Sequence, residues 1–359
     1  MNRGDDTGGR GGANLPALRG HNEALLLDLL RAAGPAGLGR AELAGRTGLT
    51  PQAVSKITAR LAAEGLVAEA GRGASTGGKP RTLLRLVPGA RHAVGVHLDR
   101  DELSAVRVDL AGRVVARTGA PLDFGAGPGP VVDAVLEAVL RVRGRAALLG
   151  VGVAAPGPLD WRGGVMGRVT GFPEWAGFPL REVLEGRLGL PVVLDKDTNA
   201  GVAADAAAGS GSGASVYLHV GTGLGAGLRL DGGIYRGARS AAGEFGHQVL
   251  RLDGPRCRCG GRGCLEVLCL EAVARGDVAG AARILGEGAA NLVALLDVDR
   301  VLLGGRVVDA APEAFASGVR AALAARGFGT AAVTLADRGV PEGAAELALT
   351  PFYTTPLHP

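Results

Sequence analysis

The chain has 359 residues, of which 47% are hydrophobic and 21% are charged, so it is too long for one small domain and has enough apolar sequence for two or three packed cores. Its apolar runs are short and broken by Gly, Pro and Arg, so we expect a soluble protein with no membrane-spanning segment and no membrane partner. The first twenty residues are Gly-rich and polar and lack the apolar core of a secretion signal. This pattern predicts a disordered tail over residues 1–20 and a cytoplasmic location.

Positive charge gathers at the N-terminal end. Residues 1–90 contain twelve Lys or Arg against seven Asp or Glu, a net charge of +5, whereas the whole chain has a net charge of +4. The asymmetry indicates that this end meets a polyanion, although a solvated basic face would produce the same count.

Three helices are expected before residue 65. Leucines recur at helical spacing over 21–31, a short second helix follows at 40–46, and a third runs from 51 to about 64. Thr50 and Pro51 form the start signal of the third helix, because a threonine caps free N–H groups and proline fits the first helical position. A short break between the last two helices is typical of a helix-turn-helix, whose second helix enters the major groove of DNA.

The outer face of the third helix is polar and basic. Val54, Ile57 and Leu61 fall on the inward side, and the residues left on the outward side are Gln52, Ser55, Lys56 and Arg60. Two strands follow at 65–69 and 82–87, and cations lie in or beside the loop that joins them, namely Arg72, Lys79 and Arg81. Residues 21–88 are therefore predicted to form a winged helix-turn-helix that binds a double-stranded DNA operator. A winged helix that binds another protein is the alternative.

One His and three of the four cysteines lie within eighteen residues: His247, Cys257, Cys259 and Cys264. Three thiolates and one imidazole suit Zn²⁺, and they fill its four tetrahedral positions, so the metal would be structural rather than catalytic. Two disulfides are the alternative, but Cys257 and Cys259 are too close in sequence to bridge each other easily.

Five motifs in the rest of the chain resemble one known family. The sequence GEFGH at 243–247 followed by CRCGGRGCLE at 257–266 resembles the signature of the ROK family, which groups bacterial sugar kinases with transcriptional repressors. The resemblance extends from about 91 to 345 through the motifs GVAAPGP at 152–158, DKDTNA at 195–200, GTGLGAG at 221–227 and LGG at 303–305. It implies an α/β domain over 91–359 with a two-lobed, actin-like ATPase fold, with lobes at about 91–199 and 200–345 and a sugar between them. A winged helix ahead of such a domain resembles the repressor branch.

The resemblance also implies roles for individual residues. Asp197 matches the position of the general base in the family's kinases, although here we favour a role as acceptor for a sugar hydroxyl with no catalytic task. Glu244, His247 and Glu266 match positions that bind sugar hydroxyls, with His247 using one ring nitrogen for zinc and the other for the sugar. For the two glutamates the alternative is support of the metal ligands or helix capping.

The chain departs from the kinase pattern at the first phosphate loop. Family kinases have a Gly-rich loop with an Asp and a Thr there, so that backbone N–H groups and Mg²⁺ meet the nucleotide phosphates. The segment GVHLDRDE at 95–102 lacks glycine after the strand and puts Asp99, Asp101 and Glu102 beside the expected phosphates. We therefore expect no kinase activity and no ATP as cofactor. The loop at 221–227 remains, but any tight strand-to-strand turn needs similar residues.

A second departure lies just before Asp197, where the family usually has asparagine and this chain has Lys196. The lysine could pair with Asp197, fill the place of the sugar, or recognise an anionic ligand such as a sugar phosphate or sugar acid.

The sequence thus predicts a homodimer, or a dimer of dimers, that represses transcription and responds to a sugar or sugar derivative. Two alternatives stay open, an active ATP-dependent sugar kinase with a DNA-binding arm, and a ligand-independent DNA-binding protein with a decayed sugar pocket.

Overall fold

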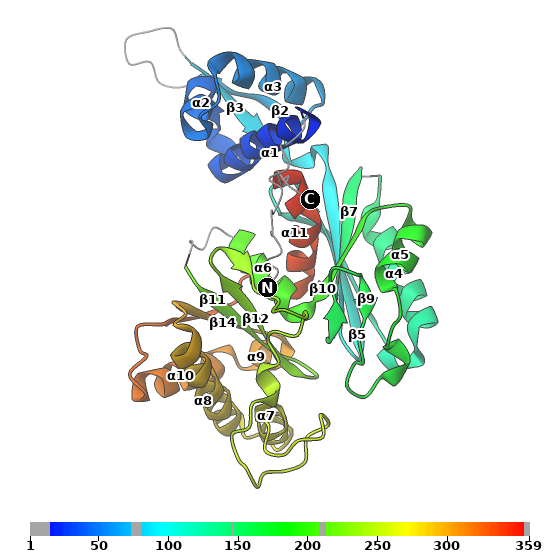
Figure 1. Cartoon of the computed structure of the whole chain (residues 1–359), viewed down its shortest axis with the longest axis vertical. Helices are drawn as coiled ribbons and strands as arrows, with labels where there is room; N and C mark the ends of the chain where they lie inside the picture. The colour runs from blue at the N-terminus through cyan, green and yellow to red at the C-terminus, as the bar shows by residue number, and fades with distance from the viewer. Residues whose placement is uncertain (1–14, 73–80, 146, 208–212, 355–359) are drawn as a thin grey trace, which may run out of the picture. The chain divides into compact units, whose positions relative to one another are not determined.

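The computed structural model describes residues 15–72, 81–145, 147–207 and 213–354 (Figure 1). It divides into two compact units, one of Met1–Ala90 with Leu349–Pro359 and one of Arg91–Ala348. The short 3-10 turns of the described chain are Gly34–Ala36, Pro88–Ala90, Phe124–Ala126, Pro173–Trp175 and Phe245–His247.

The first unit contains the three expected helices and a small antiparallel sheet of order β1-β3-β2. Its elements are α1 (Leu15–Ala33), β1 (Leu38–Gly39), α2 (Arg40–Thr47), α3 (Pro51–Ala63), β2 (Val67–Arg72) and β3 (Thr82–Leu86). The Thr50 side chain accepts a hydrogen bond from the Ala53 N–H at 3.2 Å, so α3 begins where its start signal predicts. The core of the unit includes the fully buried Leu26, Leu30 and Val54.

The expected tail ended at residue 20, but α1 already begins at Leu15. Pro16 lies in the first turn of the helix, where the backbone N–H that proline lacks has no helical partner in any case. Residues 15–20 therefore belong to a helix, and the rest of the predicted tail lies outside the described residues.

The second unit has two lobes whose sheets repeat one topology, three antiparallel strands followed by two parallel ones. The first sheet has the order β10-β7-β4-β5-β6 and the second the order β13-β12-β11-β14-β15. The strands of the first are β4 (His92–Leu98), β5 (Glu102–Asp109), β6 (Val114–Pro121), β7 (Leu148–Ala155) and β10 (Val192–Lys196), with the hairpin β8 (Leu159–Asp160) and β9 (Val165–Met166) beside it. Those of the second are β11 (Ser215–Val220), β12 (Leu224–Leu230), β13 (Gly233–Ile234), β14 (Arg300–Gly304) and β15 (Ala332–Leu335).

Helices cover each sheet and bury a separate core. The first sheet packs against α4 (Pro128–Arg143) and α5 (Leu180–Leu188). The second packs against α7 (Leu265–Ala274), α8 (Val278–Leu296), α9 (Arg306–Ala310) and α10 (Pro312–Ala325). By length and composition α8 could cross a membrane, which the sequence analysis did not anticipate. Its apolar face packs into the core of the second lobe, which accounts for that composition.

Two helices, α6 (Asp197–Ala207) and α11 (Val340–Tyr353), join the lobes. Figure 1 shows α11 on the face of the first sheet opposite α4 and α5. A Cβ on Gly95 would lie 1.9 Å from the Pro341 carbonyl oxygen, and one on Gly152 would lie 1.8 Å from that of Ala344. Glycine in both strands therefore lets the helix backbone pack directly on the sheet. Residues 340–345 were predicted as the end of the second lobe, at about 200–345, and their helix packs on the sheet of the first lobe as well as joining the two lobes.

Candidate ligand pocket and metal centre

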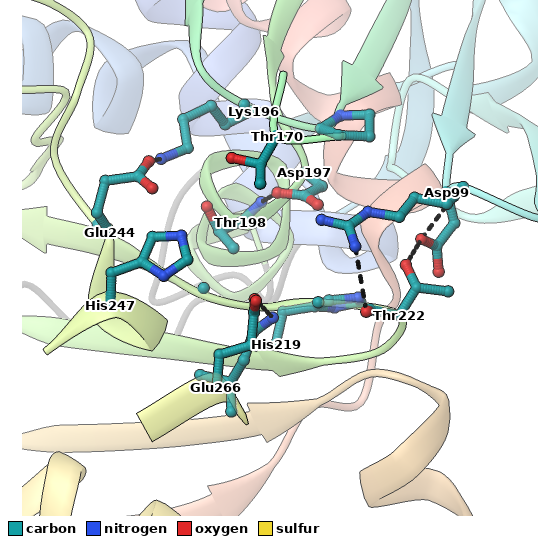
Figure 2. Close-up of a pocket in the computed structure, with 17 residues that line it drawn as sticks. Asp99, Thr170, Lys196, Asp197, Thr198, His219, Thr222, Glu244, His247 and Glu266 are labelled. Carbon is teal, nitrogen blue, oxygen red and sulfur yellow. Dashed lines mark hydrogen bonds and ion pairs between the residues drawn. The ribbon is translucent and has the colours of Figure 1, made fainter. Parts of the chain in front are cut away.

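A pocket lies between the two lobes (Figure 2). It brings together all four residues expected to contact a sugar, Asp197, Glu244, His247 and Glu266. Its free volume is about 80 Å³. The sequence analysis did not assign the following lining residues to it: Arg100, Thr170, Thr198, His219 and Thr222. Arg100, Thr198 and Thr222 stand inside the motifs quoted at 95–102, 195–200 and 221–227, whereas Thr170 and His219 lie in no quoted motif.

Local structure positions the side chains of three of the four residues expected to contact a sugar. Asp197 is the first residue of α6, and its Oδ1 accepts a hydrogen bond from the Thr198 N–H at 2.6 Å. Glu266 lies in the first turn of α7, and its Oε2 accepts a hydrogen bond from the Leu224 N–H at 3.0 Å. His247 ends the turn Phe245–His247 and points into the pocket in Figure 2.

Lys196 is bound to Glu244 and not to Asp197. Its Nζ donates to Glu244 Oε1 at 2.7 Å and to the Ala242 carbonyl oxygen at 3.0 Å. The Lys196 side chain is only 6% exposed, whereas that of Glu244 is 46% exposed. The methylene stem of the lysine runs along Gly157, where a Cβ would come 2.9 Å from Lys196 Cε.

The neighbouring Asp195 is a structural residue. Its carboxylate is buried and accepts hydrogen bonds from the Lys196 N–H, the Asn199 amide and Arg236. The Arg236 guanidinium also lies 4.2 Å from the centroid of the Trp161 ring, in a cation–π contact. These contacts bind the segment before Glu244 to the first lobe.

The turn after β4, residues 99–101, crosses to the second lobe. Asp99 Oδ1 accepts a hydrogen bond from the Thr222 hydroxyl, Arg100 Nη1 lies 3.5 Å from the Thr222 carbonyl oxygen, and Asp101 forms an ion pair with Arg306 at 2.8 Å. Burial alone would raise the pKa of Asp99, but the hydrogen bonds from Thr222 and from the Arg100 N–H outweigh it, so that pKa is lowered. The carboxylates of this turn are thus engaged by protein groups.

Two histidines face each other behind the 99–101 turn. The rings of His97 on β4 and His219 on β11 meet edge to face, with 5.8 Å between centroids, and His219 Nδ1 lies 3.2 Å from the Tyr217 hydroxyl. Burial, reinforced by His219, lowers the pKa of His97 to about 4. His97 Nε2 is buried and has no hydrogen-bond partner among the described residues.

The predicted metal ligands converge. The ligand atoms of His247, Cys257, Cys259 and Cys264 all lie within 4.8 Å of one another. Cys259 Sγ and Cys264 Sγ are 3.7 Å apart, as are Cys257 Sγ and His247 Nδ1. Zinc with Zn–S bonds of about 2.3 Å and a tetrahedral arrangement would separate two sulfurs by about 3.8 Å and a sulfur from a nitrogen by about 3.6 Å. The donor atoms and their spacing therefore fit zinc, whereas bonded disulfide sulfurs lie about 2.05 Å apart.

The remaining cysteine is a small core side chain. Cys269 is fully buried, and its Sγ lies 3.6 Å from the Ala281 carbonyl oxygen.

The residues predicted to contact DNA are exposed where the structure describes them. Gln52, Ser55, Lys56 and Arg60 all lie on the exposed face of α3. Arg60 forms an ion pair with Glu23 of α1, which the sequence analysis did not foresee. Arg81 is exposed at the start of the second wing strand, whereas Lys79 and the side chain of Arg72 lie outside the described residues.

Comparison with known proteins identifies the class. The profile of the ROK family matches residues 94–278, and the chain belongs to this family. A xylose repressor of Bacillus spizizenii is 26% identical over 257 residues, which are 70% of this chain and 66% of that repressor. The chain thus matches slightly under two thirds of the length of this curated relative.

Solved structures share the fold. The crystal structure of a ROK-family transcriptional regulator, a homologue of the Escherichia coli MLC protein, has a TM-score of 0.77 at 20% identity, covering 95% of this chain and 98% of its own. A ROK-family glucokinase from Streptomyces griseus in complex with glucose and AMPPNP has a TM-score of 0.63 at 26% identity, covering 71% and 98%. The predicted ROK membership is therefore confirmed, and the second unit has the family's α/β, actin-like fold.

Proposed function

We propose that this protein is a transcriptional repressor that binds operator DNA through its first unit and a sugar or sugar derivative in the pocket of its second unit. The observation that carries the proposal is the convergence of Asp197, Glu244, His247 and Glu266 in one pocket, in a chain that also has a three-helix unit with a two-stranded wing. The similarity to a xylose repressor supports the same function. A DNA operator as partner implies a cytoplasmic location.

Zinc has a structural role in this proposal. The three cysteines and His247 would fill its coordination positions, leaving none for a substrate. His247 Nδ1 faces the thiols while the ring lines the pocket, so the metal would hold the imidazole in the orientation that a ligand meets. Zinc therefore links the fold of residues 247–264 to ligand binding.

The second candidate, a sugar kinase, is disfavoured by the 99–101 turn. Phosphoryl transfer needs backbone N–H groups and Mg²⁺ around the nucleotide phosphates. Here Asp99 accepts a hydrogen bond from Thr222 and Asp101 forms an ion pair with Arg306, both of the second lobe. Protein contacts thus stand where family kinases have the first phosphate loop. We expect no ATP hydrolysis in a coupled assay with common hexoses and pentoses, and robust turnover would establish the kinase instead.

The repressor would act as a homodimer or a dimer of dimers, so that two copies of α3 reach operator half-sites about 34 Å apart. A ligand releases the DNA only if it binds more tightly to the DNA-free state than to the bound one.

DNA binding is tested with the full chain on operator fragments selected from random DNA, with fluorescence anisotropy as the readout. Lys56→Ala should weaken binding at least tenfold and reduce the salt dependence, because it removes a cation from the exposed face of α3. Arg283→Ala removes the same charge from an exposed site on α8 and should leave affinity unchanged. Equal affinities of the Lys56→Ala variant and the unmodified chain would contradict the assignment of α3 to the groove.

A further inference from the structure

The pocket has little free space among its lining side chains. Its free volume is about 80 Å³, whereas an enclosed cavity of about 150 Å³ holds benzene. A sugar ring with its hydroxyl groups is larger than benzene. A sugar that occupies the interior of the pocket therefore displaces a lining side chain.

Among the three carboxylates expected to contact a sugar, that of Glu244 is the most easily displaced. The carboxylates of Asp197 and Glu266 are held by the backbone N–H groups of Thr198 and Leu224. The Glu244 side chain is 46% exposed, and its carboxylate has one recorded partner in the described part of the chain, Lys196. The Glu244 side chain can rotate into solvent, and among the described residues this breaks only its ion pair with Lys196.

The Lys196 side chain stays buried when Glu244 rotates into solvent. The lysine side chain is 6% exposed, its stem is enclosed against Gly157, and its Nζ is also held by the Ala242 carbonyl oxygen. Once Glu244 leaves, a buried ammonium faces the pocket with only a neutral partner. A buried charge without a counter-ion is strongly unfavourable. A neutral sugar would therefore bind at the expense of a broken buried ion pair.

We propose that the ligand is a monosaccharide with an anionic substituent, a carboxylate or a phosphate, that replaces Glu244 as the partner of Lys196. The inference rests on the proposed function and names its ligand class. With a carboxylate the exchange leaves the net charge of the pocket unchanged, because one anion enters as one carboxylate leaves. A phosphate, with a charge of about −1.5 to −2, makes the pocket more negative. The uncharged hydroxyl groups then meet Asp197, His247 and Glu266, which line the rest of the pocket in Figure 2.

Isothermal titration calorimetry on the full chain tests the exchange. The ligands are glucose and xylose as neutral sugars, gluconate and glucuronate as sugar acids, and glucose 6-phosphate. We expect at least tenfold tighter binding of one anionic sugar than of glucose. The carboxylate and phosphate arms identify which anion the site takes.

Two pocket variants and one control locate the effect. Lys196→Asn should abolish the preference for the anionic sugar, because it removes the cation. Glu244→Gln should tighten binding of the anionic sugar several-fold, because it removes the competing carboxylate. Arg283→Asn removes the same charge from an exposed site on α8, outside the pocket, and should leave the preference unchanged. If Lys196→Asn fails to fold, Glu244→Gln still decides the question.

The outcomes separate this inference from the proposed function. Tight binding of a neutral sugar, with no gain for the anionic sugar in Glu244→Gln, would overturn the inference and leave a neutral-sugar repressor standing. Binding of none of these ligands, by a chain that still binds operator DNA, would overturn both the anionic ligand and the sugar-responsive function.

Discussion

The environment of His97 makes the stability of the second unit depend on pH. The pKa of His97 is lowered to about 4, whereas an exposed histidine titrates near 6.5. Between these values the unfolded chain binds a proton that the folded chain rejects, so stability is complete above pH 6.5 and falls as the pH drops towards 4. The loss amounts to roughly 3 kcal/mol over that window.

His97→Phe should remove this contribution, because phenylalanine keeps a ring in the site and does not titrate. Urea unfolding at pH 7, 6, 5 and 4.5, followed by the fluorescence of Trp161 and Trp175, reports on the second unit, which contains both tryptophans. Parallel pH profiles for the two proteins would contradict the lowered pKa of His97, because they would mean that this residue binds the same number of protons in the folded and unfolded chains.

How well a residue's role could be predicted depended on how local its contacts are. The four predicted metal ligands lie within eighteen residues and have a spacing typical of metal sites, so their clustering followed from the sequence. The partner of Lys196 lies 48 positions away and that of Asp99 lies 123 positions away. No periodicity or spacing rule joins residues at such separations, so Glu244 and Thr222 could not be chosen over other carboxylates and hydroxyls.

At the scale of elements, the loop from His247 to Cys264 should depend on its metal. The loop has little regular structure, and metal binding supplies folding free energy in such segments. Cys259→Ser, or removal of the metal by a chelator, should lower the melting temperature and weaken ligand binding at least tenfold, because His247 loses its fixed orientation. Metal content is measured by elemental analysis and ligand binding by calorimetry.

Cys269→Ala is the matched control for the metal, because it removes the cysteine that lies in the core rather than in the cluster. It should retain one zinc ion per chain and normal ligand affinity. Full ligand affinity in metal-free protein would refute the link between zinc and His247.

The start of an element could be predicted where neighbouring residues determine it. The place of an element in the fold could not be predicted where contacts between distant residues determine it. The start of α3 follows from Thr50 and Pro51, which act on the adjacent backbone. The return of α11 to the first lobe depends on Gly95 and Gly152, two strand glycines that admit a helix from more than 190 residues further along the chain. A glycine in a strand indicates close approach but does not identify what approaches.

At the scale of the second unit, polar contacts join the lobes on both sides of the pocket. On one side Asp195 and Lys196 bind the segment from Arg236 to Glu244, and on the other the 99–101 turn binds Thr222 and Arg306. These contacts differ in burial and therefore in the free energy they contribute. Asp99 is 8% exposed, whereas the side chains of Asp101 and Arg306 are 56% and 41% exposed.

We expect the buried Asp99–Thr222 hydrogen bond to stabilise the contact between the lobes more than the exposed Asp101–Arg306 ion pair does. Thr222→Val leaves the Asp99 carboxylate without its hydroxyl donor and should destabilise the second unit by about 1–3 kcal/mol. Arg306→Ala removes an exposed ion pair and should cost less than about 1 kcal/mol. Urea unfolding measures both, and amide hydrogen exchange should show faster opening over 99–102 and 220–224 only in Thr222→Val. A larger cost for Arg306→Ala than for Thr222→Val would mean that the exposed ion pair, and not the buried hydroxyl, holds the lobes together.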